Sequence, residues 1–294
     1  MEEAQFKQER LQGIVGDQHR GAAQLAREAL QVLADYSAIC TAGGSGEFIG
    51  KLCDYAGELQ QSRPSMMPLR NLLEQWCARV RNLPKTEVDN MRGLAIDYAY
   101  DLIKQSQAAV EKIARHAAAL VPAGSVVITH SHSSTVTECF RQLSGKNVTA
   151  IITESRPGDE GKALASQLVE CAISAHYITD AQMGLFVSQA DLVLVGADSI
   201  LADGSVVNKA GTYLMALAAD NLDVPFYVCA ETFKKTSNTK LEIELEEKPG
   251  DELELPVLPH ITPRNIYFDI TPPALITGWI NEDGLETGFY NKKS

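Results

Sequence analysis

The sequence predicts an α/β protein in which an all-helical N-terminal domain precedes a Rossmann-like domain built on a parallel sheet. Up to about residue 120, apolar residues recur at three- and four-residue spacing, which is typical of amphipathic helices. From Ser125 onward, short β-rich runs alternate with helical stretches at the spacing of crossover connections, which favours parallel strands covered on both faces. We therefore expect domains at 1–120 and 121–294.

The individual elements follow from periodicity and from Gly and Pro breaks. In the first domain, stretches such as 41–46 separate the helical segments. Helices are expected at 21–36, 47–61, 67–81 and 88–120. In the second domain, strands are expected at 126–129, 148–153, 175–179, 192–195 and 225–229. Helices are expected between them at 134–143, 161–172, 180–189 and 212–221. The strands form continuous apolar runs, which indicates burial on both faces of the sheet.

Composition and charge exclude several classes of function. The chain has 294 residues, 45% hydrophobic content and a formal net charge of −12, so nucleic acid and anionic membranes would repel it as a whole. We expect no direct nucleic-acid partner and no membrane association. No apolar run is long enough to span a bilayer, and the charged N-terminus lacks the apolar core of a secretory signal. These features predict a cytoplasmic protein.

The cysteine and glycine patterns argue against metals and cofactors. The six cysteines are scattered without a C-x-x-C pair and are typical of small buried residues in a reducing compartment. The histidines lack H-E-x-x-H spacing, and no G-x-G-x-x-G follows the first strand of the α/β domain. We expect no metal site and no cofactor.

The segment 193–212 is the most informative in the chain. It predicts a buried strand that ends in a polar loop with Asp198, followed by Asn208 and Lys209 at the head of a helix. A carboxylate, an amide, an ammonium group and a helix N-terminus at a strand's carboxyl end favour binding of an anionic ligand with hydroxyl groups. The alternative is a tight strand–turn–helix connection in which the polar residues serve only as caps.

Two other strand ends carry polar clusters. After the strand at 126–129, hydroxyl and imidazole groups open a helix and could hold a phosphate or sugar hydroxyls. The members of this cluster are His130, Ser131, His132, Ser133 and Ser134. N-capping by Ser133 or Ser134 would explain only one or two of them. After the strand at 148–153, Arg156 could pair bidentately with a phosphate or form a surface salt bridge.

Weaker cationic signals lie elsewhere. Arg20, with Gly21 and Ala22, and Arg63 each stand at a helix boundary, and Lys234 follows the strand at 225–229. A lone cation of this kind is usually an ordinary surface residue. The acidic stretch at 242–254 is interpreted as a solvated surface connection.

Taken together, the motifs resemble a known superfamily. They are Gly196–Ala–Asp–Ser–Ile200, Asn208–Lys–Ala–Gly–Thr212, Thr129–His–Ser–His–Ser–Ser134, Thr153–Glu–Ser–Arg–Pro157 and Phe268–Asp–Ile–Thr–Pro–Pro273. The superfamily comprises the alpha, beta and delta subunits of translation initiation factor 2B, methylthioribose-1-phosphate isomerase and archaeal ribose-1,5-bisphosphate isomerase. The Gly-Ala-Asp form looks most similar to the ribose-1,5-bisphosphate isomerase branch, since the initiation-factor subunits more often carry Gly-Ala-Glu.

The resemblance implies a helical domain packed on a Rossmann-like domain, and a homodimer or higher homo-oligomer that forms through the latter. It implies a sugar phosphate as ligand, and conversion of an aldose 1-phosphate into a ketose phosphate without a cofactor. Asp198 would be one catalytic residue. The sugar-phosphate contacts implied by motif position are Arg20, Gly21, Arg63, Asn208, Lys209 and Lys234.

The chain departs from the isomerase pattern at Ser131, where the resemblance implies a catalytic cysteine. A thiol exchanges protons near neutral pH, whereas a serine hydroxyl needs an activating base. Three explanations stay open: a non-catalytic sensor, an isomerase that uses Ser131 with His130 or His132 as base, or a substitution introduced to trap a ligand. The sequence thus supports two hypotheses, a sugar-phosphate isomerase and a regulatory protein akin to the initiation-factor subunits.

Overall fold

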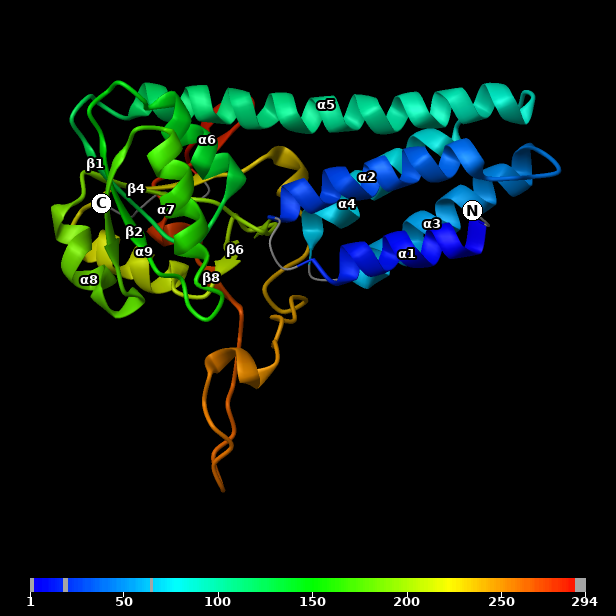
Figure 1. The fold of residues 1–294 in the computed structure, drawn as a ribbon. Coiled ribbons are helices and arrows are strands. Elements are labelled where there is room, and N and C mark those ends of the chain that lie inside the picture. The colour runs from blue at the N-terminus through cyan, green and yellow to red at the C-terminus, as the bar shows by residue number, and fades with distance from the viewer. Residues whose placement is uncertain (1–2, 18–20, 64–65, 289–294) are drawn as a thin grey trace. The chain divides into compact units, whose positions relative to one another are not determined.

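A computed structural model of the chain describes residues 3–17, 21–63 and 66–288. The chain divides into two compact units, Met1–Ala108 and Ala109–Ser294, here called the helical unit and the sheet unit. The boundary lies within the long helix α5, Val88–Leu120 (Figure 1). Among the described residues, no helix combines the length and the apolar character needed to cross a bilayer.

Among its described residues, the helical unit contains three of the predicted helices, the first part of the fourth, and one helix more. Three of the predicted helices are α2 (Ala22–Ile39), α3 (Ser45–Ser62) and α4 (Met67–Arg81), and the fourth is α5. The N-terminal helix α1, Glu3–Val15, was not predicted, because it buries only Phe6 and Ile14 and has no clear apolar stripe. The core of this unit is built around Tyr55 and Trp76, and the indole of Trp76 donates a hydrogen bond to the Ala95 carbonyl at 3.0 Å.

The sheet unit is built on a mostly parallel seven-stranded sheet, which confirms the predicted fold class. The predicted strands are β1 (Val126–Thr129), β2 (Thr149–Thr153), β3 (Ser174–Ile178), β4 (Leu192–Val195) and β7 (Phe226–Cys229). Two further strands, β9 (Gly278–Asn281) and β10 (Gly284–Glu286), extend one side. Among the described residues the order is β10-β9-β7-β4-β1-β2-β3, and only the β10–β9 pair is antiparallel.

Alternate residues of the central strands enter two separate cores on opposite faces of the sheet. Val127 and Leu194 belong to the core covered by α6 (Ser134–Gln142) and α7 (Glu160–Glu170). Ile128 and Val193 belong to the core covered by α8 (Met183–Phe186) and α9 (Thr212–Asn221). The helix predicted at 180–189 is largely replaced by 3₁₀ turns, Asp180–Gln182 and Val187–Gln189, on either side of α8.

Burial on both faces was wrong for β3. This strand lies at the edge of the sheet, and four of its five residues are exposed. An edge strand has a neighbour on one side only, and α7 is the helix packed against it. Its sequence, Ser-Ala-His-Tyr-Ile, is less apolar than those of the central strands, so the predicted burial does not apply to it.

A second, antiparallel sheet was also missed. It consists of β5 (Ser199–Ile200), β6 (Val206–Lys209) and β8 (Phe268–Thr271), in that order. Asn208 and Lys209, which were expected at the head of a helix, thus lie in strand β6. Between Lys248 and Tyr267 the chain leaves the unit and returns, and residues 249–266 project from it as an extension that we call the arm (Figure 1).

Candidate functional site

The three polar loops predicted from the sequence follow β1, β2 and β4, which are neighbours in the sheet. Since these strands are parallel, their carboxyl ends meet at one edge, and the loops after them lie together there. The connections from β1 and β4 leave the sheet in opposite directions, to α6 on one face and toward α9 on the other. A parallel sheet opens its binding crevice at such a point. We therefore place the candidate site at this edge.

Asp198 follows β4 and is fixed by its backbone, whose N–H donates to the Val207 carbonyl at 2.9 Å. Among the described residues, its half-buried carboxylate has no hydrogen bond or ion pair. Burial raises the pKa of Asp198 to about 6, and the charge of Lys234 opposes this rise. The carboxyl group is thus able to gain or lose a proton close to neutral pH.

Lys234 lies in the 3₁₀ turn Thr232–Lys234, immediately beyond β7, and is itself buried. Its Nζ atom is 3.0 Å from Oε2 of Glu231, whose side chain is fully buried. Glu231 in turn accepts a hydrogen bond from Thr135 at the start of α6, at 3.1 Å. Lys234 therefore supplies positive charge near Asp198 while part of that charge is neutralised by Glu231.

The hydroxyl of Ser131 donates a hydrogen bond to Oε2 of Glu160, the first residue of α7. The backbone of Ser131 has a left-handed conformation with φ 68°, and its N–H donates to Oγ of Ser155 at 2.8 Å. The loop after β2 therefore holds the loop after β1 in place. This arrangement directs the Ser131 side chain to a carboxylate.

Glu160 is the hub of a charged cluster. Its Oε1 atom accepts hydrogen bonds from Tyr267 at 2.6 Å and from Lys209 at 3.2 Å. The ammonium of Lys209 lies 3.2 Å from the centre of the Tyr267 ring, and that of Lys248 lies 3.5 Å from it. Burial acts to raise the pKa of Glu160, but Lys209 and the two hydroxyl donors outweigh it, so the pKa is lowered and the group stays ionised.

The hypothesis that His130 or His132 serves as base for Ser131 does not fit these contacts. The buried His130 donates from Nε2 to the Ala210 carbonyl at 2.9 Å and contacts Thr153 at 2.7 Å through Nδ1. Burial lowers the pKa of His130, which keeps the ring neutral. His132 is bonded to Gln167 of α7 at 2.9 Å. The partner of Ser131 is Glu160 instead.

Several predicted binding residues have structural partners. Ser133 caps α6 by accepting from the Val136 N–H, and Ser134 is the first residue of that helix. The Asn208 amide donates to Thr212 at 2.9 Å. These contacts match the alternative in which the polar residues serve as caps and connections.

The N-terminus of α9 was expected to face an anion, and it does face one, but the anion belongs to the protein. Oδ2 of Asp269 in β8 accepts from the N–H groups of Gly211 at 2.7 Å and Tyr213 at 3.1 Å. Burial raises the pKa of Asp269 to about 6, against these two hydrogen bonds. An external anion at this helix end would have to displace Asp269.

Arg156 forms a surface ion-pair network. Its guanidinium lies 3.2 Å from Glu254 of the arm and 3.5 Å from Asp159. Its backbone N–H, like that of Ser155, donates to the Asp180 carboxylate. The salt-bridge alternative thus describes the contacts of this side chain.

The remaining predicted residues lie in the helical unit. Arg63 donates to the carbonyls of Ile14 and Val15, at 3.3 and 2.8 Å, and to that of Asp17, and so closes the end of α1. Gly21 is the N-cap of α2 and Ala22 its first residue. Arg20 lies outside the described residues.

Glu160, Tyr267 and Asp269 were missed as members of the site. An acidic residue in the first turn of a helix is common, so Glu160 gave no local signal. Tyr267 stands 107 residues from its partner Glu160, and Asp269 stands 58 residues from its partner Gly211. The pairing of β8 with β6 brings each of them close to its partner. Asp269 did fall within the motif at 268–273, but its neighbours in sequence suggested no partner.

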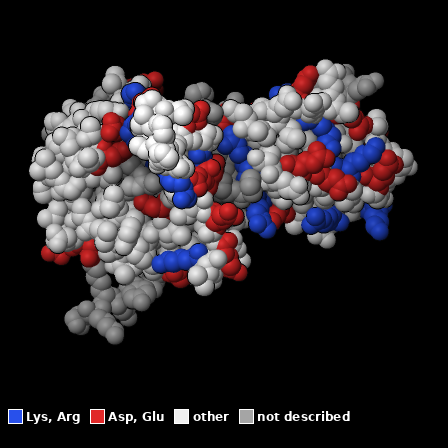
Figure 2. Space-filling model, turned by 90° about the horizontal axis from the view of Figure 1, so that it is seen from below, with Lys and Arg blue, Asp and Glu red and all other residues white. Residues whose placement is uncertain are grey.

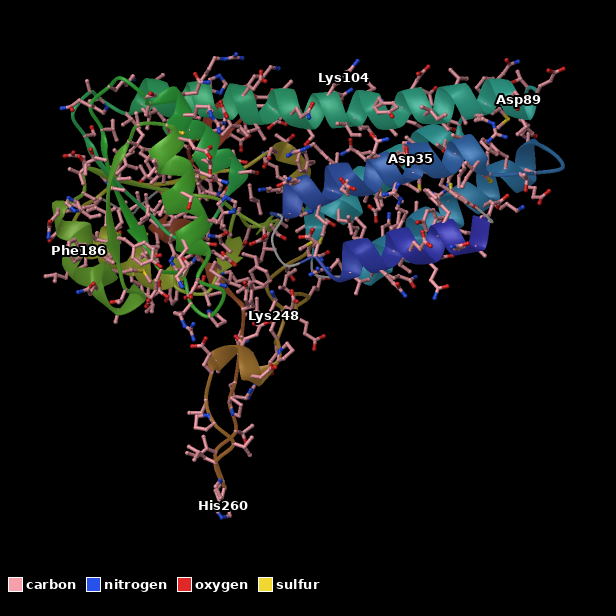
Figure 3. The ribbon with its side chains drawn as sticks, in the orientation of Figure 1. Asp35, Asp89, Lys104, Phe186, Lys248 and His260 are labelled. Carbon is pink, nitrogen blue, oxygen red and sulfur yellow. The ribbon has the colours of Figure 1, made fainter. Side chains whose placement is uncertain are left out.

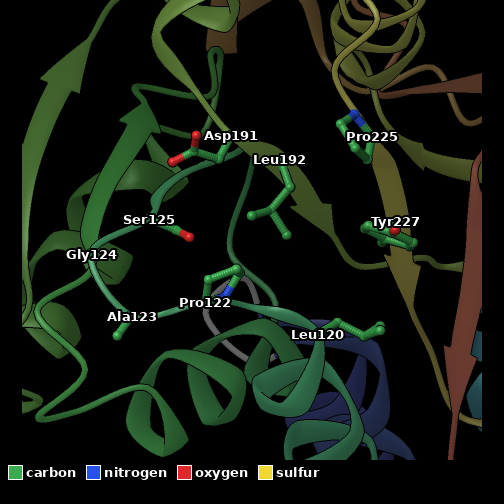
Figure 4. A pocket seen from close by; sticks show the side chains of 9 residues that line it. All are labelled: Leu120, Pro122, Ala123, Gly124, Ser125, Asp191, Leu192, Pro225 and Tyr227. Atoms are coloured by element: carbon green, nitrogen blue, oxygen red, sulfur yellow. The ribbon is translucent and has the colours of Figure 1, made fainter.

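A pocket of about 360 Å³ lies at the opposite edge of the sheet. Residues such as Ser125, Asp191 and Pro225, which precede β1, β4 and β7, line it (Figure 4). None of the predicted site residues that the structure describes lines it. We locate the candidate site by the convergence of charged side chains at the carboxyl edge, since the chemistry gathers there.

Comparisons with known proteins agree with this architecture. Residues 18–288 match the model of the Initiation factor 2 subunit family. A Pyrococcus furiosus protein named eIF-2B subunit 2-like is 41% identical over 78% of this chain and 78% of its own. The ribose 1,5-bisphosphate isomerase of the same organism is 32% identical over 90% of this chain and 86% of its own. The crystal structure of translation initiation factor eIF-2B from Pyrococcus horikoshii has a TM-score of 0.83 at 33% identity and covers 96% of this chain and 97% of its own.

Proposed function

The chain belongs to the Initiation factor 2 subunit family, and on this premise we propose that it binds a phosphorylated ribose derivative at the carboxyl edge of β1, β2 and β4. The observation that carries the proposal is the Asp198 carboxylate. It is unpartnered among the described residues and titrates near pH 6, beside the buried cations Lys234 and Lys209. A carboxylate left without a partner in such a place is suited to a ligand hydroxyl or to a transferred proton.

The ligand class follows from the charges and donors. A phosphate needs cations, and Lys209 and Lys234 supply two at this edge. Sugar hydroxyls need acceptors, and Asp198 and Glu160 supply them. A ribose phosphate with a second anionic substituent, such as ribose-1,5-bisphosphate, uses these groups most fully.

The proposed reaction is an aldose-to-ketose isomerisation in which a proton moves between C2 and C1 of the opened sugar. Asp198 would carry that proton, because a carboxyl group with a pKa of about 6 takes up and releases protons at neutral pH. The Ser131 hydroxyl would stand opposite, polarised by the ionised Glu160. The buried lysines would stabilise the enolate charge that develops.

The alternative function is a regulatory subunit or metabolite sensor that binds the sugar phosphate without turnover. Ser131 favours it, because a serine hydroxyl is a far weaker acid than a thiol and its partner Glu160 is already shared with Lys209 and Tyr267. Loss of a general acid or base typically costs ~10²–10⁴-fold in rate. The two functions share one binding site and differ in chemistry alone.

One experiment distinguishes them. Ribose-1,5-bisphosphate and methylthioribose-1-phosphate are each incubated with wild-type protein, Asp198→Asn and Ser131→Cys, and ketose formation is followed by NMR. Turnover by wild type that Asp198→Asn abolishes supports the isomerase. Tight binding in calorimetry without wild-type turnover supports the sensor, and activity gained in Ser131→Cys would locate the defect at that residue. Absence of binding to either compound would refute both.

A further inference from the structure

Two thiols of the helical unit are in contact between neighbouring helices. Cys53 lies near the middle of α3 and Cys77 lies in α4, and these two helices pack together. The Cys77 thiol donates a hydrogen bond to the sulfur of Cys53. Figure 3 shows sulfur atoms, in yellow, among the packed helices of this unit. The fold thus places a sulfur of one helix against a sulfur of the next.

The two members of the pair differ in their access to solvent. Cys53 is half-buried, whereas Cys77 is only 4% exposed. All six cysteines of the chain lie within the described residues, and the five other than Cys53 are buried. A reagent in solution therefore reaches Cys53 before any other thiol, and Cys77 is shielded directly beside it.

Arg81 influences the charge state of Cys53. It follows Cys77 by one helical turn in α4, so the two side chains lie on the same face of that helix. Its guanidinium donates a second hydrogen bond to the Cys53 sulfur. The hydrogen bond from Cys77 and the charge of Arg81 lower the pKa of Cys53 to about 7, against the effects of burial and of Asp54. A large share of Cys53 is then thiolate at neutral pH, and the thiolate is the reactive form.

A second thiol pair, in the sheet unit, lacks this combination of features. Cys139 of α6 is hydrogen-bonded to Cys229 of β7, and both residues are fully buried. The Cys229 contact and burial raise the pKa of Cys139, and the neighbouring Glu138 and Glu231 act in the same direction. Contact between two thiols therefore occurs twice in the molecule, but access to solvent and a stabilised thiolate distinguish Cys53.

We propose that Cys53 and Cys77 form a peroxide-sensitive pair, in which hydrogen peroxide oxidises Cys53 and Cys77 then closes a disulfide between α3 and α4. In the first step the Cys53 thiolate attacks one peroxide oxygen, the O–O bond breaks, and the released hydroxide takes up a proton to form water. Cys53 is then a sulfenic acid. In the second step the Cys77 sulfur attacks the Cys53 sulfur, and the S–O bond breaks. The departing hydroxide leaves as water with the proton of Cys77. Two thiols thus lose two electrons, and one peroxide becomes two waters.

A small uncharged oxidant fits the surroundings of the pair. On the face shown in Figure 2, the helical unit carries Lys and Arg interspersed with Asp and Glu. Such a surface has no field of a single sign that would concentrate a charged reagent. Hydrogen peroxide needs no such field to reach a half-buried sulfur. The pair belongs to the helical unit, and its chemistry is independent of whether the sheet unit turns over a sugar phosphate.

The test uses the full, reduced chain and hydrogen peroxide at pH 7. After oxidation the protein is denatured, free thiols are blocked with iodoacetamide, and disulfides are reduced and labelled with N-ethylmaleimide for mass spectrometry. We expect Cys53 and Cys77 to carry the second label together, and Cys139 and Cys229 to carry only the first. In the native, unoxidised chain, iodoacetamide should modify Cys53 at least roughly 10-fold faster than any buried cysteine.

Three variants separate the roles of the residues. Cys77→Ala should form no disulfide and should leave Cys53 as a sulfenic acid, which dimedone traps. Arg81→Met should move the midpoint of the pH profile of Cys53 alkylation upward by about 1 pH unit, because the guanidinium no longer stabilises the thiolate. Cys171→Ala, in the sheet unit, is the control and should oxidise like wild type. Near-UV circular dichroism checks the fold of each variant.

The contrary outcomes are equally specific. The proposal would be overturned if Cys53 stayed reduced in hydrogen peroxide, or if it formed its disulfide with a cysteine other than Cys77. Equal rates of alkylation for Cys53 and the buried cysteines of the native chain would also overturn it. A disulfide that still formed at Cys53 in Cys77→Ala would show that Cys77 is not its partner.

Discussion

The ammonium of Lys209 lies 3.2 Å from the carboxylate of Glu160, in a pair whose lysine is almost completely buried. Burial lowers the pKa of Lys209, and Glu160 is the chief group that opposes this. The pair joins β6 of the small sheet to the start of α7 on the main sheet. It therefore holds the two halves of the candidate site together and keeps a cation available for an anionic ligand.

Replacing Glu160 by Gln should leave this buried cation without its counter-charge. We expect the free energy of unfolding to fall by about 3 kcal/mol, because breaking one side of a buried pair strands the other charge. Inorganic phosphate should restore much of that loss by taking the place of the carboxylate. Urea unfolding with and without phosphate measures both effects. Glu74→Gln, which breaks the exposed Arg70–Glu74 pair, is the control and should change stability by less than about 1 kcal/mol. Equal behaviour of the two variants would contradict the expectation.

Asp198→Asn should change how stability depends on pH. Burial raises the pKa of Asp198 to about 6, whereas an unfolded aspartate titrates near 3.9, so the folded chain holds this proton more tightly. The associated stability is fully present below about pH 4 and is lost as the pH rises through about 6. Two pKa units correspond to about 3 kcal/mol, which the partial exposure of the side chain reduces to about 1–2 kcal/mol.

The measurement is the difference in unfolding free energy between wild type and Asp198→Asn from pH 4 to pH 8. The variant should gain on wild type as the pH rises and reach its full advantage above pH 7. Taking the difference removes the titration of Asp269, whose pKa lies in the same range. A difference that does not vary with pH would show that Asp198 titrates normally.

Asp269→Ala should weaken the start of α9. The carboxylate accepts hydrogen bonds from the N–H groups of Gly211 and Tyr213, and loss of an N-terminal cap typically costs about 1–2 kcal/mol. Asp269→Asn, which keeps an acceptor oxygen, should recover part of that cost. Thermal unfolding compares these variants with Asp251→Asn, an exposed residue of the arm. If Asp269→Ala unfolded at the same temperature as Asp251→Asn, the capping role would be refuted.

Gly161→Ala should be among the most harmful small substitutions in the chain. A Cβ atom at Gly161 would lie 1.9 Å from the Thr153 carbonyl oxygen, so α7 would have to move away from β2. We expect a loss of more than about 3 kcal/mol and a displaced Glu160. Gly57→Ala in α3 is a matched control, because its Cβ would meet no atom within 4 Å and alanine favours a helix by roughly 0.5–1 kcal/mol. Unfolding in urea should move in opposite directions for the two variants.

Periodicity predicted the main sheet and most helices because each of those elements buries a regular apolar pattern. The small sheet escaped prediction, since β5 has only two residues and β8 pairs with a strand about 60 positions earlier. The same distinction between local and long-range signals applies to the site residues. Asp198 and Ser131 were recognised by their positions just beyond β4 and β1, whereas Glu160 and Tyr267 acquire their roles only through contacts across the fold. The local sequence predicts which residue follows a strand, but it does not predict which side chain from a distant part of the chain contacts that residue.

The two ends of the arm meet at one aromatic ring, with the Lys248 ammonium 3.5 Å from the ring of Tyr267. Residues 249–266 thus form a loop whose two ends are already held together at the site. Doubling the length of such a loop costs only about 0.6 kcal/mol in closure entropy. The length and sequence of the arm tip are therefore independent of the site. Residues can be inserted, deleted or replaced by a different peptide there while the residues around Glu160 keep their places.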